Sequence, residues 1–196
     1  MNSTTTIVSI ILAGLFTNNI VLSKFLGISS FLEVSKKTRT IFLMSATITL
    51  IMVIATAITW PIYQYILHPN FAYLETIVFV LVIVGIVELI KFLLARFLKP
   101  VYDAIGAYLP LAITNCAVLG VTILNTTSGF NFIESLVNAF SAGLGFMLAL
   151  FLFAGVRQRM EIAKVPEGLK GLPITLVAAA IISLAFFGFV GLFAVT

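Results

Sequence analysis

Long apolar runs alternate with short polar stretches along almost the whole chain of 196 residues. A helix needs about 20 mostly apolar residues to span a membrane, and six runs reach roughly that length. These runs cover residues 6–31, 41–67, 74–97, 101–124, 132–156 and 172–195. The pattern predicts an all-α integral membrane protein, in which six transmembrane helices form one membrane domain over residues 1–196.

The composition supports a membrane location. Hydrophobic residues make up 61% of the chain, charged residues make up 9%, and the mean hydropathy is +1.21. A soluble domain carries roughly 25% charged residues. This chain therefore has too few polar groups to cover a surface in water, and an ordinary soluble enzyme is excluded.

The basic residues occupy alternate connections between the predicted spans. All 11 lysines and arginines fall into three groups, at the first, third and fifth connections. The groups are Lys24, Lys36, Lys37 and Arg39; Lys91, Arg96 and Lys99; and Arg157, Arg159, Lys164 and Lys170. Because basic loops stay in the cytoplasm, we expect a multi-pass protein of the bacterial cytoplasmic (inner) membrane with both termini outside. The net charge of +4 then reflects topology and not a nucleic-acid partner.

One short sequence occurs twice, half a chain apart. Residues 17–22 read Thr-Asn-Asn-Ile-Val-Leu and residues 114–119 read Thr-Asn-Cys-Ala-Val-Leu, so four of six positions are identical at an offset of 97. Three predicted spans separate the copies, and an odd number reverses the direction of the chain through the bilayer. The match predicts two inverted three-helix repeats, over about residues 5–97 and 100–195.

Both copies interrupt an apolar run with polar residues. Asparagine is a poor helix former because its amide competes for backbone hydrogen bonds. We therefore expect Asn18, Asn19 and Asn115 to mark breaks near the midplane in the first and fourth helices, with Pro110 supporting the second break. Alternatively, these asparagines only hold neighbouring helices together.

Glu88 is predicted to lie within the third span, past the middle of the bilayer. A carboxylate at that depth is a functional candidate by default, so Glu88 could line a cation path. The alternative is a structural ion pair with Lys91, which lies one turn away.

Cys116 is the single cysteine, and it falls inside the second break. One thiol cannot form an internal disulfide, and one cysteine with one distant histidine cannot build a zinc or iron–sulfur site within the chain. A small buried side chain is the simplest interpretation of Cys116. The sequence also contains no phosphate loop, dinucleotide fingerprint or catalytic triad, so we expect no complete catalytic site in this chain.

Several motifs together resemble the Rnf-Nqr family of membrane subunits. They are residues 17–27 (TNNIVLSKFLG), 33–37 (EVSKK), 108–111 (YLPL), 114–120 (TNCAVLG), 155–157 (GVR) and 165–171 (VPEGLKG). The likeness spans nearly the whole chain. The Lys-Phe-Leu-Gly segment and the short carboxy-terminal tail favour the A type of subunit, found in the Rnf complex, over its paralogues.

The resemblance implies a role in electron transfer. In this family the A and E subunits pair in the membrane, and each contributes two cysteines, one from each broken helix, to a shared [2Fe–2S] cluster. Subunits B, C, D and G complete the Rnf complex, in which electron flow from reduced ferredoxin to NAD⁺ drives Na⁺ or H⁺ outward. By this correspondence Cys116 is one iron ligand, and Ser29 stands where the family has its other cysteine. No cofactor is expected to bind this chain alone.

The serine at position 29 keeps a second hypothesis open. A chain of this fold that lost the redox role would be a transporter-like or structural membrane subunit. Iron at the interface with a partner subunit would support the first hypothesis, and an iron-free homo-oligomer would support the second.

Overall fold

The computed structural model describes residues 3–29, 38–68, 71–97, 99, 102, 106, 108–162, 166, 168 and 171–188. Every regular element in these ranges is a helix. Four helical stretches are long and apolar enough to cross a membrane: Arg39–Leu67, Glu75–Phe97, Leu109–Thr127 and Phe132–Met160. Two shorter apolar helices, Ile7–Thr17 and Leu172–Phe187, accompany them. The prediction of an all-helical membrane protein is thus confirmed. The arrangement as six spans stays a prediction, because parts of the first, fourth and sixth predicted runs lie outside the described residues.

The helices follow one another in a simple order along the chain. They are α1 (Ser3–Leu12), the π-helix η1 (Ala13–Thr17), α3 (Thr38–Ile62), the π-helix η2 (Tyr63–Leu67), the 3₁₀ turn η3 (Ala72–Leu74), α4 (Glu75–Phe97), α6 (Leu109–Ile113), α7 (Cys116–Thr127), α8 (Phe132–Ile162) and α9 (Leu172–Phe187).

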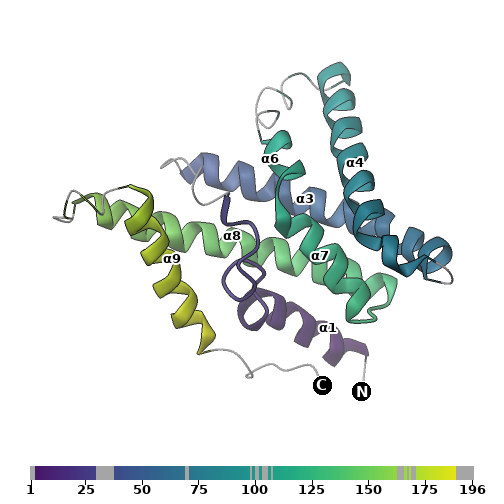
Figure 1. Ribbon diagram of the computed structural model, residues 1–196, viewed down its shortest axis with the longest axis horizontal. Coiled ribbons are helices and arrows are strands. Elements are labelled where there is room, and N and C mark those ends of the chain that lie inside the picture. Colours follow the sequence, from purple (N-terminus) through teal and green to yellow (C-terminus); the bar gives the residue numbers. More distant parts are fainter. Residues whose placement is uncertain are drawn as a thin grey trace.

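Helices α3 and α8 form the centre of the molecule. They run side by side in opposite directions, and α1, α7 and α9 cross over them (Figure 1). Gly143 on α8 allows this close approach, because a Cβ atom there would collide with the side chain of Thr49 on α3. Phe146 and Phe153 of α8 are almost fully buried in the same core. Small residues at a helix crossing are the usual way for membrane helices to pack closely.

Helices α4 and α9 lie at the periphery. Leu81 and Phe92 on α4 and Leu184 on α9 are largely exposed, as expected for surfaces that face lipid or a neighbouring protein. The start of α4 is tied to the end of α7, since the Thr126 hydroxyl donates a hydrogen bond to the Glu75 carboxylate. This link places the lower end of α4 beside α7 (Figure 1).

Candidate functional site at two helix breaks

The first helix ends in a π-helical turn. Within η1 each backbone N–H reaches back five residues instead of four, and the turn closes with the Asn18 N–H donating to the Ala13 carbonyl at 2.6 Å. Such single-turn π-helices often occur at functional sites. The side chain of Asn18 is exposed, so Asn18 ends the helix through its backbone alone.

Asn19, the next residue, is fully buried and organises the break. Its amide nitrogen donates to the Leu15 carbonyl at 3.1 Å and to the Gly145 carbonyl on α8 at 2.8 Å. Its side-chain oxygen accepts the N–H groups of Val21 at 3.1 Å and Leu22 at 3.2 Å. Backbone groups freed inside a membrane protein need such partners, and Asn19 provides them for both sides of the break.

The chain after Asn19 turns back on itself and does not continue as a regular helix. The Ser23 hydroxyl donates to the Thr17 carbonyl at 2.9 Å, and the Ser183 hydroxyl on α9 donates to the Leu22 carbonyl. Phe25 and Gly27 then adopt left-handed backbone conformations, with φ of 57° and 83°. A left-handed conformation is costly for a side chain such as phenylalanine, so the packing of neighbouring elements must hold this turn in place.

The second break lies between α6 and α7. Asn115 is the N-cap of α7, and its side-chain oxygen accepts the Ala117 N–H at 2.9 Å. Pro110 does not cause the interruption, contrary to the sequence-based expectation. It occupies the first turn of α6, where proline costs no hydrogen bond because the N–H has no partner within the helix.

The two breaks meet through Gly27 and Cys116. The Gly27 N–H donates to the Cys116 sulfur at 2.9 Å. A Cβ atom on Gly27 would lie 3.0 Å from the Asn115 side-chain oxygen and 3.0 Å from Phe146. Only glycine combines this positive φ with such close packing.

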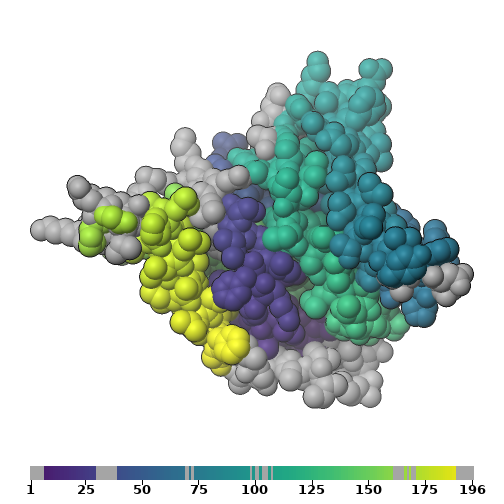
Figure 2. Space-filling model, in the orientation of Figure 1, coloured from purple at the N-terminus to yellow at the C-terminus, as the bar shows by residue number. Residues whose placement is uncertain are grey.

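The Cys116 residue is exposed in the isolated chain. Figure 2 shows the segment of the first break at the molecular surface, between α9 in yellow and the green α6 and α7. Cys116 is also the first residue of α7, directly after the Asn115 cap. The two breaks therefore present one exposed sulfur atom, with a backbone N–H donor beside it, on this face of the chain.

The other predicted site residues lie in different surroundings. Ser29 is exposed and lies two residues after Gly27, at the start of a helical stretch. Glu88 is on α4, where its carboxylate lies 3.6 Å from the Lys91 ammonium and its side chain is 55% exposed. It points away from the core of the chain and toward its periphery. Within the described ranges, no three His, Cys, Asp or Glu residues come together in a way that could hold a metal ion.

Gly27 is a site residue that the sequence reasoning did not select. It belongs to the Lys-Phe-Leu-Gly segment, but only the fold reveals that its N–H meets the Cys116 sulfur. The charge pattern predicts Lys24 to be a loop residue that determines topology, whereas the Lys24 side chain lines a cavity together with Ser128 and Phe130, which follow the C-terminal end of α7. Lys24 reaches this cavity because the chain after Asn19 forms a series of turns and does not continue as a helix.

Comparison with known proteins gives a consistent picture. The model of the Rnf-Nqr family, described as "Rnf-Nqr subunit, membrane protein", matches residues 7–193. The A subunit of the Na⁺-translocating ferredoxin:NAD⁺ oxidoreductase complex of Acetobacterium woodii is 45% identical over 95% of this chain and 98% of its own length. The A subunits of the ion-translocating oxidoreductase complexes of Syntrophotalea carbinolica and Serratia proteamaculans are 42% and 44% identical, over 93% and 89% of this chain and 95% and 91% of their own lengths.

These relatives extend over nearly the whole chain, including both breaks. Their names support the resemblance to the A type of subunit that the sequence motifs indicate. The chain belongs to the Rnf-Nqr family of membrane subunits.

Proposed function

We propose that the chain is a membrane core subunit of a complex that moves electrons from reduced ferredoxin to NAD⁺ and exports Na⁺ or H⁺. The relatives that cover almost the full length are the A subunits of ion-translocating oxidoreductase complexes. In the A position, the chain would act with an E-type homologue and with subunits B, C, D and G. Its own part in the reaction would be to help form an electron relay inside the membrane.

The observation that carries the proposal is the exposed Cys116 at the meeting point of the two breaks. A [2Fe–2S] cluster is held by four ligands, normally thiolates, so this chain can supply only part of a ligand set. A sulfur at the chain surface, at a helix N-terminus and with the Gly27 N–H at 2.9 Å, fits one ligand of a cluster shared across an interface. Hydrogen bonds to cluster sulfurs are one of the levers on reduction potential.

Ser29 fits the cluster less well than a cysteine would. A serine alkoxide is harder and more basic than a thiolate, and soft thiolates are the ligands that iron–sulfur clusters select. We propose that Ser29 provides the second position of this chain's half-site, with weaker metal retention as the consequence. When bound, the cluster would carry single electrons between the two sides of the membrane.

The decisive experiment compares Cys116→Ala with Thr114→Ala, an exposed neighbour in the second break. Both variants would be purified within the complete complex, and interface iron would be measured by chemical assay and electron paramagnetic resonance. Cys116→Ala should remove the signal of one cluster while the complex still assembles, and Thr114→Ala should keep it. Unchanged iron and electron transfer in Cys116→Ala would reject the cluster ligand.

A redox-inactive protein of the same fold is the second candidate, favoured by Ser29 alone. This alternative predicts that the purified wild-type chain contains no iron at its partner interface and still supports ion movement. The iron assay on the wild-type complex separates the two functions directly.

We further propose six spans arranged as two inverted repeats, with both termini outside the bacterial cytoplasmic membrane. The interruptions at residues 18–19 and 114–115 are the main support for the repeat. The partition of the basic residues other than Lys24, which lines a cavity with Ser128 and Phe130, supports the orientation. Reporter fusions after His68 should read as external, whereas fusions near Phe97 and Lys164 should read as cytoplasmic. One clear reversal would reject this orientation.

A further inference from the structure

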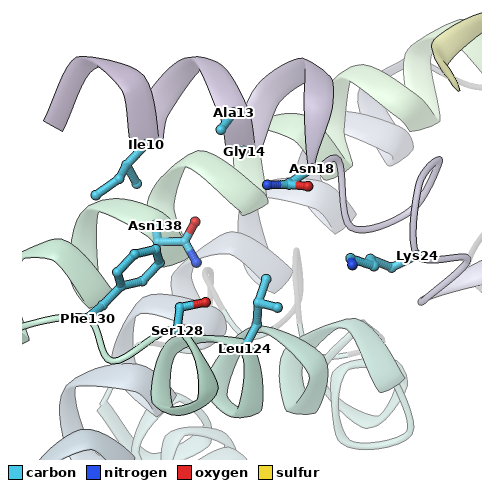
Figure 3. Close-up of a pocket in the computed structure, with 9 residues that line it drawn as sticks. All are labelled: Ile10, Ala13, Gly14, Asn18, Lys24, Leu124, Ser128, Phe130 and Asn138. Atoms are coloured by element: carbon cyan, nitrogen blue, oxygen red, sulfur yellow. The ribbon is translucent and has the colours of Figure 1, made fainter. Parts of the chain in front are cut away.

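A cavity of about 470 Å³ lies between the first break and the ends of α7 and α8. Polar groups from three parts of the chain point into it: Asn18 and Lys24 from the first break, Ser128 after α7, and Asn138 on α8 (Figure 3). Ile10 and Leu124 contribute apolar wall. Neither the proposed cluster position nor the Glu88 region accounts for this cavity.

The polar groups in the cavity have unused hydrogen-bonding capacity. Among the described residues, Lys24 has no carboxylate within 4.0 Å, and the Asn18 side chain makes no hydrogen bond. Asn138 is only 8% exposed, and its amide nitrogen donates to Asn125 at 2.7 Å. The side-chain oxygen of Asn138 accepts no hydrogen bond from the described residues. The Lys24 side chain is exposed at this cavity, so its ammonium group is available to an anionic ligand.

The chemistry of the lining favours an oxyanion. Lys24, Asn18 and Ser128 can all donate hydrogen bonds, and the described lining contains no carboxylate to repel a negative ligand. Lysine is a common point-charge ligand for phosphate. The apolar wall beside these donors suits a hydrocarbon chain attached to the anion. We propose that the cavity binds the phosphate group of an anionic phospholipid, with its acyl chain against Ile10 and Leu124.

The test measures lipid retained by the purified complete complex. The complex would be reconstituted in vesicles that contain equal amounts of phosphatidylglycerol and phosphatidylcholine, re-extracted in mild detergent, and analysed by quantitative mass spectrometry. Lys24→Gln is compared with Lys91→Gln, which removes the same charge from a lysine on α4 that already pairs with Glu88. We expect Lys24→Gln to lower phosphatidylglycerol retention about tenfold, because a charge-assisted hydrogen bond is lost. Lys91→Gln should leave retention unchanged.

Asn18→Leu provides a second variant that should not disturb folding, since the Asn18 side chain is exposed. It should reduce phosphatidylglycerol retention several-fold at normal yield of the complex. Excess inorganic phosphate distinguishes the two sources of a phosphate group. Lipid retained in the presence of this competitor supports the proposal, whereas a wild-type complex that retains no phosphatidylglycerol and binds inorganic phosphate would show that the cavity takes free phosphate instead.

Two other results would overturn the proposal. The first is equal loss of lipid in Lys24→Gln and Lys91→Gln, which would indicate a general charge effect. The second is a wild-type complex that retains phosphatidylcholine as well as it retains phosphatidylglycerol.

Discussion

The two breaks begin from similar sequences and reach different structures. In the first, a π-helical turn ends at Thr17 and the chain continues through turns with positive φ at Phe25 and Gly27. In the second, the chain is extended for one residue at Asn115 and then re-enters a regular helix of 12 residues. The first break is thus a folded loop that contacts with α8 and α9 hold in place. The second break is the start of a helix, which the neighbouring Asn115 side chain caps.

The two breaks also differ in which asparagine of the matching sequences accepts backbone N–H groups. Aligned at the offset of 97, Asn18 corresponds to Asn115 and Asn19 corresponds to Cys116. The structural counterpart of Asn115 is nevertheless Asn19, because both side-chain oxygens accept the N–H two residues ahead. The π-helical turn explains the shift, since its five-residue hydrogen bond takes up one extra residue before the cap. Sequence identity therefore located the breaks, and the structure shows that Asn19, not Asn18, accepts the backbone N–H groups at the first break.

The largest expected effect is that of Asn19→Leu. Leucine has a similar size but removes hydrogen bonds to two carbonyls and two N–H groups, all in a buried site. Each buried group left without a partner costs about 1–3 kcal/mol, so the loss should be on the order of 4 kcal/mol and the complex should fail to assemble. Assembly would be followed by size-exclusion chromatography of the detergent extract.

Asn18→Leu is the matched control for Asn19→Leu. It makes the same substitution one residue earlier, at an exposed side chain, and it should assemble normally. Equal yields for the two variants would show that the Asn19 hydrogen bonds do not hold the first break.

A smaller loss is expected for Gly27→Ala. The new Cβ meets Asn115 and Phe146 at 3.0 Å in a left-handed conformation, and strain and overpacking together should cost about 3 kcal/mol. Gly129→Ala separates the two causes, since Gly129 has a φ of 65° but open space around it. It should cost only about 1 kcal/mol. Thermal stability of the purified complex would measure both, and equal losses would refute the role of close packing at Gly27.

Ser29→Cys tests the chemical difference between the breaks, because it gives the first break the thiol that the second has in Cys116. A thiolate is softer than an alkoxide, so interface iron should be retained several-fold longer against a chelator, and the cluster potential should rise. Stability of the fold should barely change, since Ser29 is exposed. Chelator kinetics and redox titration followed by paramagnetic resonance would measure these effects. Identical values for wild type and variant would remove Ser29 from the ligand set.

The smallest structural effect belongs to Glu88→Gln, which lies outside both breaks. The Glu88–Lys91 pair is about half exposed, and an exposed ion pair contributes little to stability. We expect normal assembly and reduced ion transport, as proposed for a carboxylate on the cation path. Lys91→Gln is the control that breaks the same pair and keeps the carboxylate. Unchanged ion transport in Glu88→Gln would reject the cation-path role, so that the ion pair with Lys91 would remain as the only role of Glu88.

The amino-acid sequence alone is enough to predict the membrane class, the helical architecture and the positions of the interruptions. Inside a bilayer the backbone N–H and C=O groups must form hydrogen bonds within the protein. A continuous apolar run of about 20 residues meets this need by forming a helix. Asparagine amides can bond to nearby backbone groups and so favour an interruption, as at Asn19 and Asn115, although Asn138 lies within the continuous helix α8. Both effects depend only on residues close together in the chain, so they can be predicted from the sequence.

The contacts between the two breaks follow from the fold and not from the local sequence. That Asn19 donates to Gly145, that the Gly27 N–H meets the Cys116 sulfur, and that Lys24 turns into a cavity beside Ser128 all depend on contacts between distant segments. The donors and acceptors in these contacts are separated by 126 and 89 residues for the two hydrogen bonds. No local propensity encodes such distances, because they follow from how α1, α7 and α8 pack around the core.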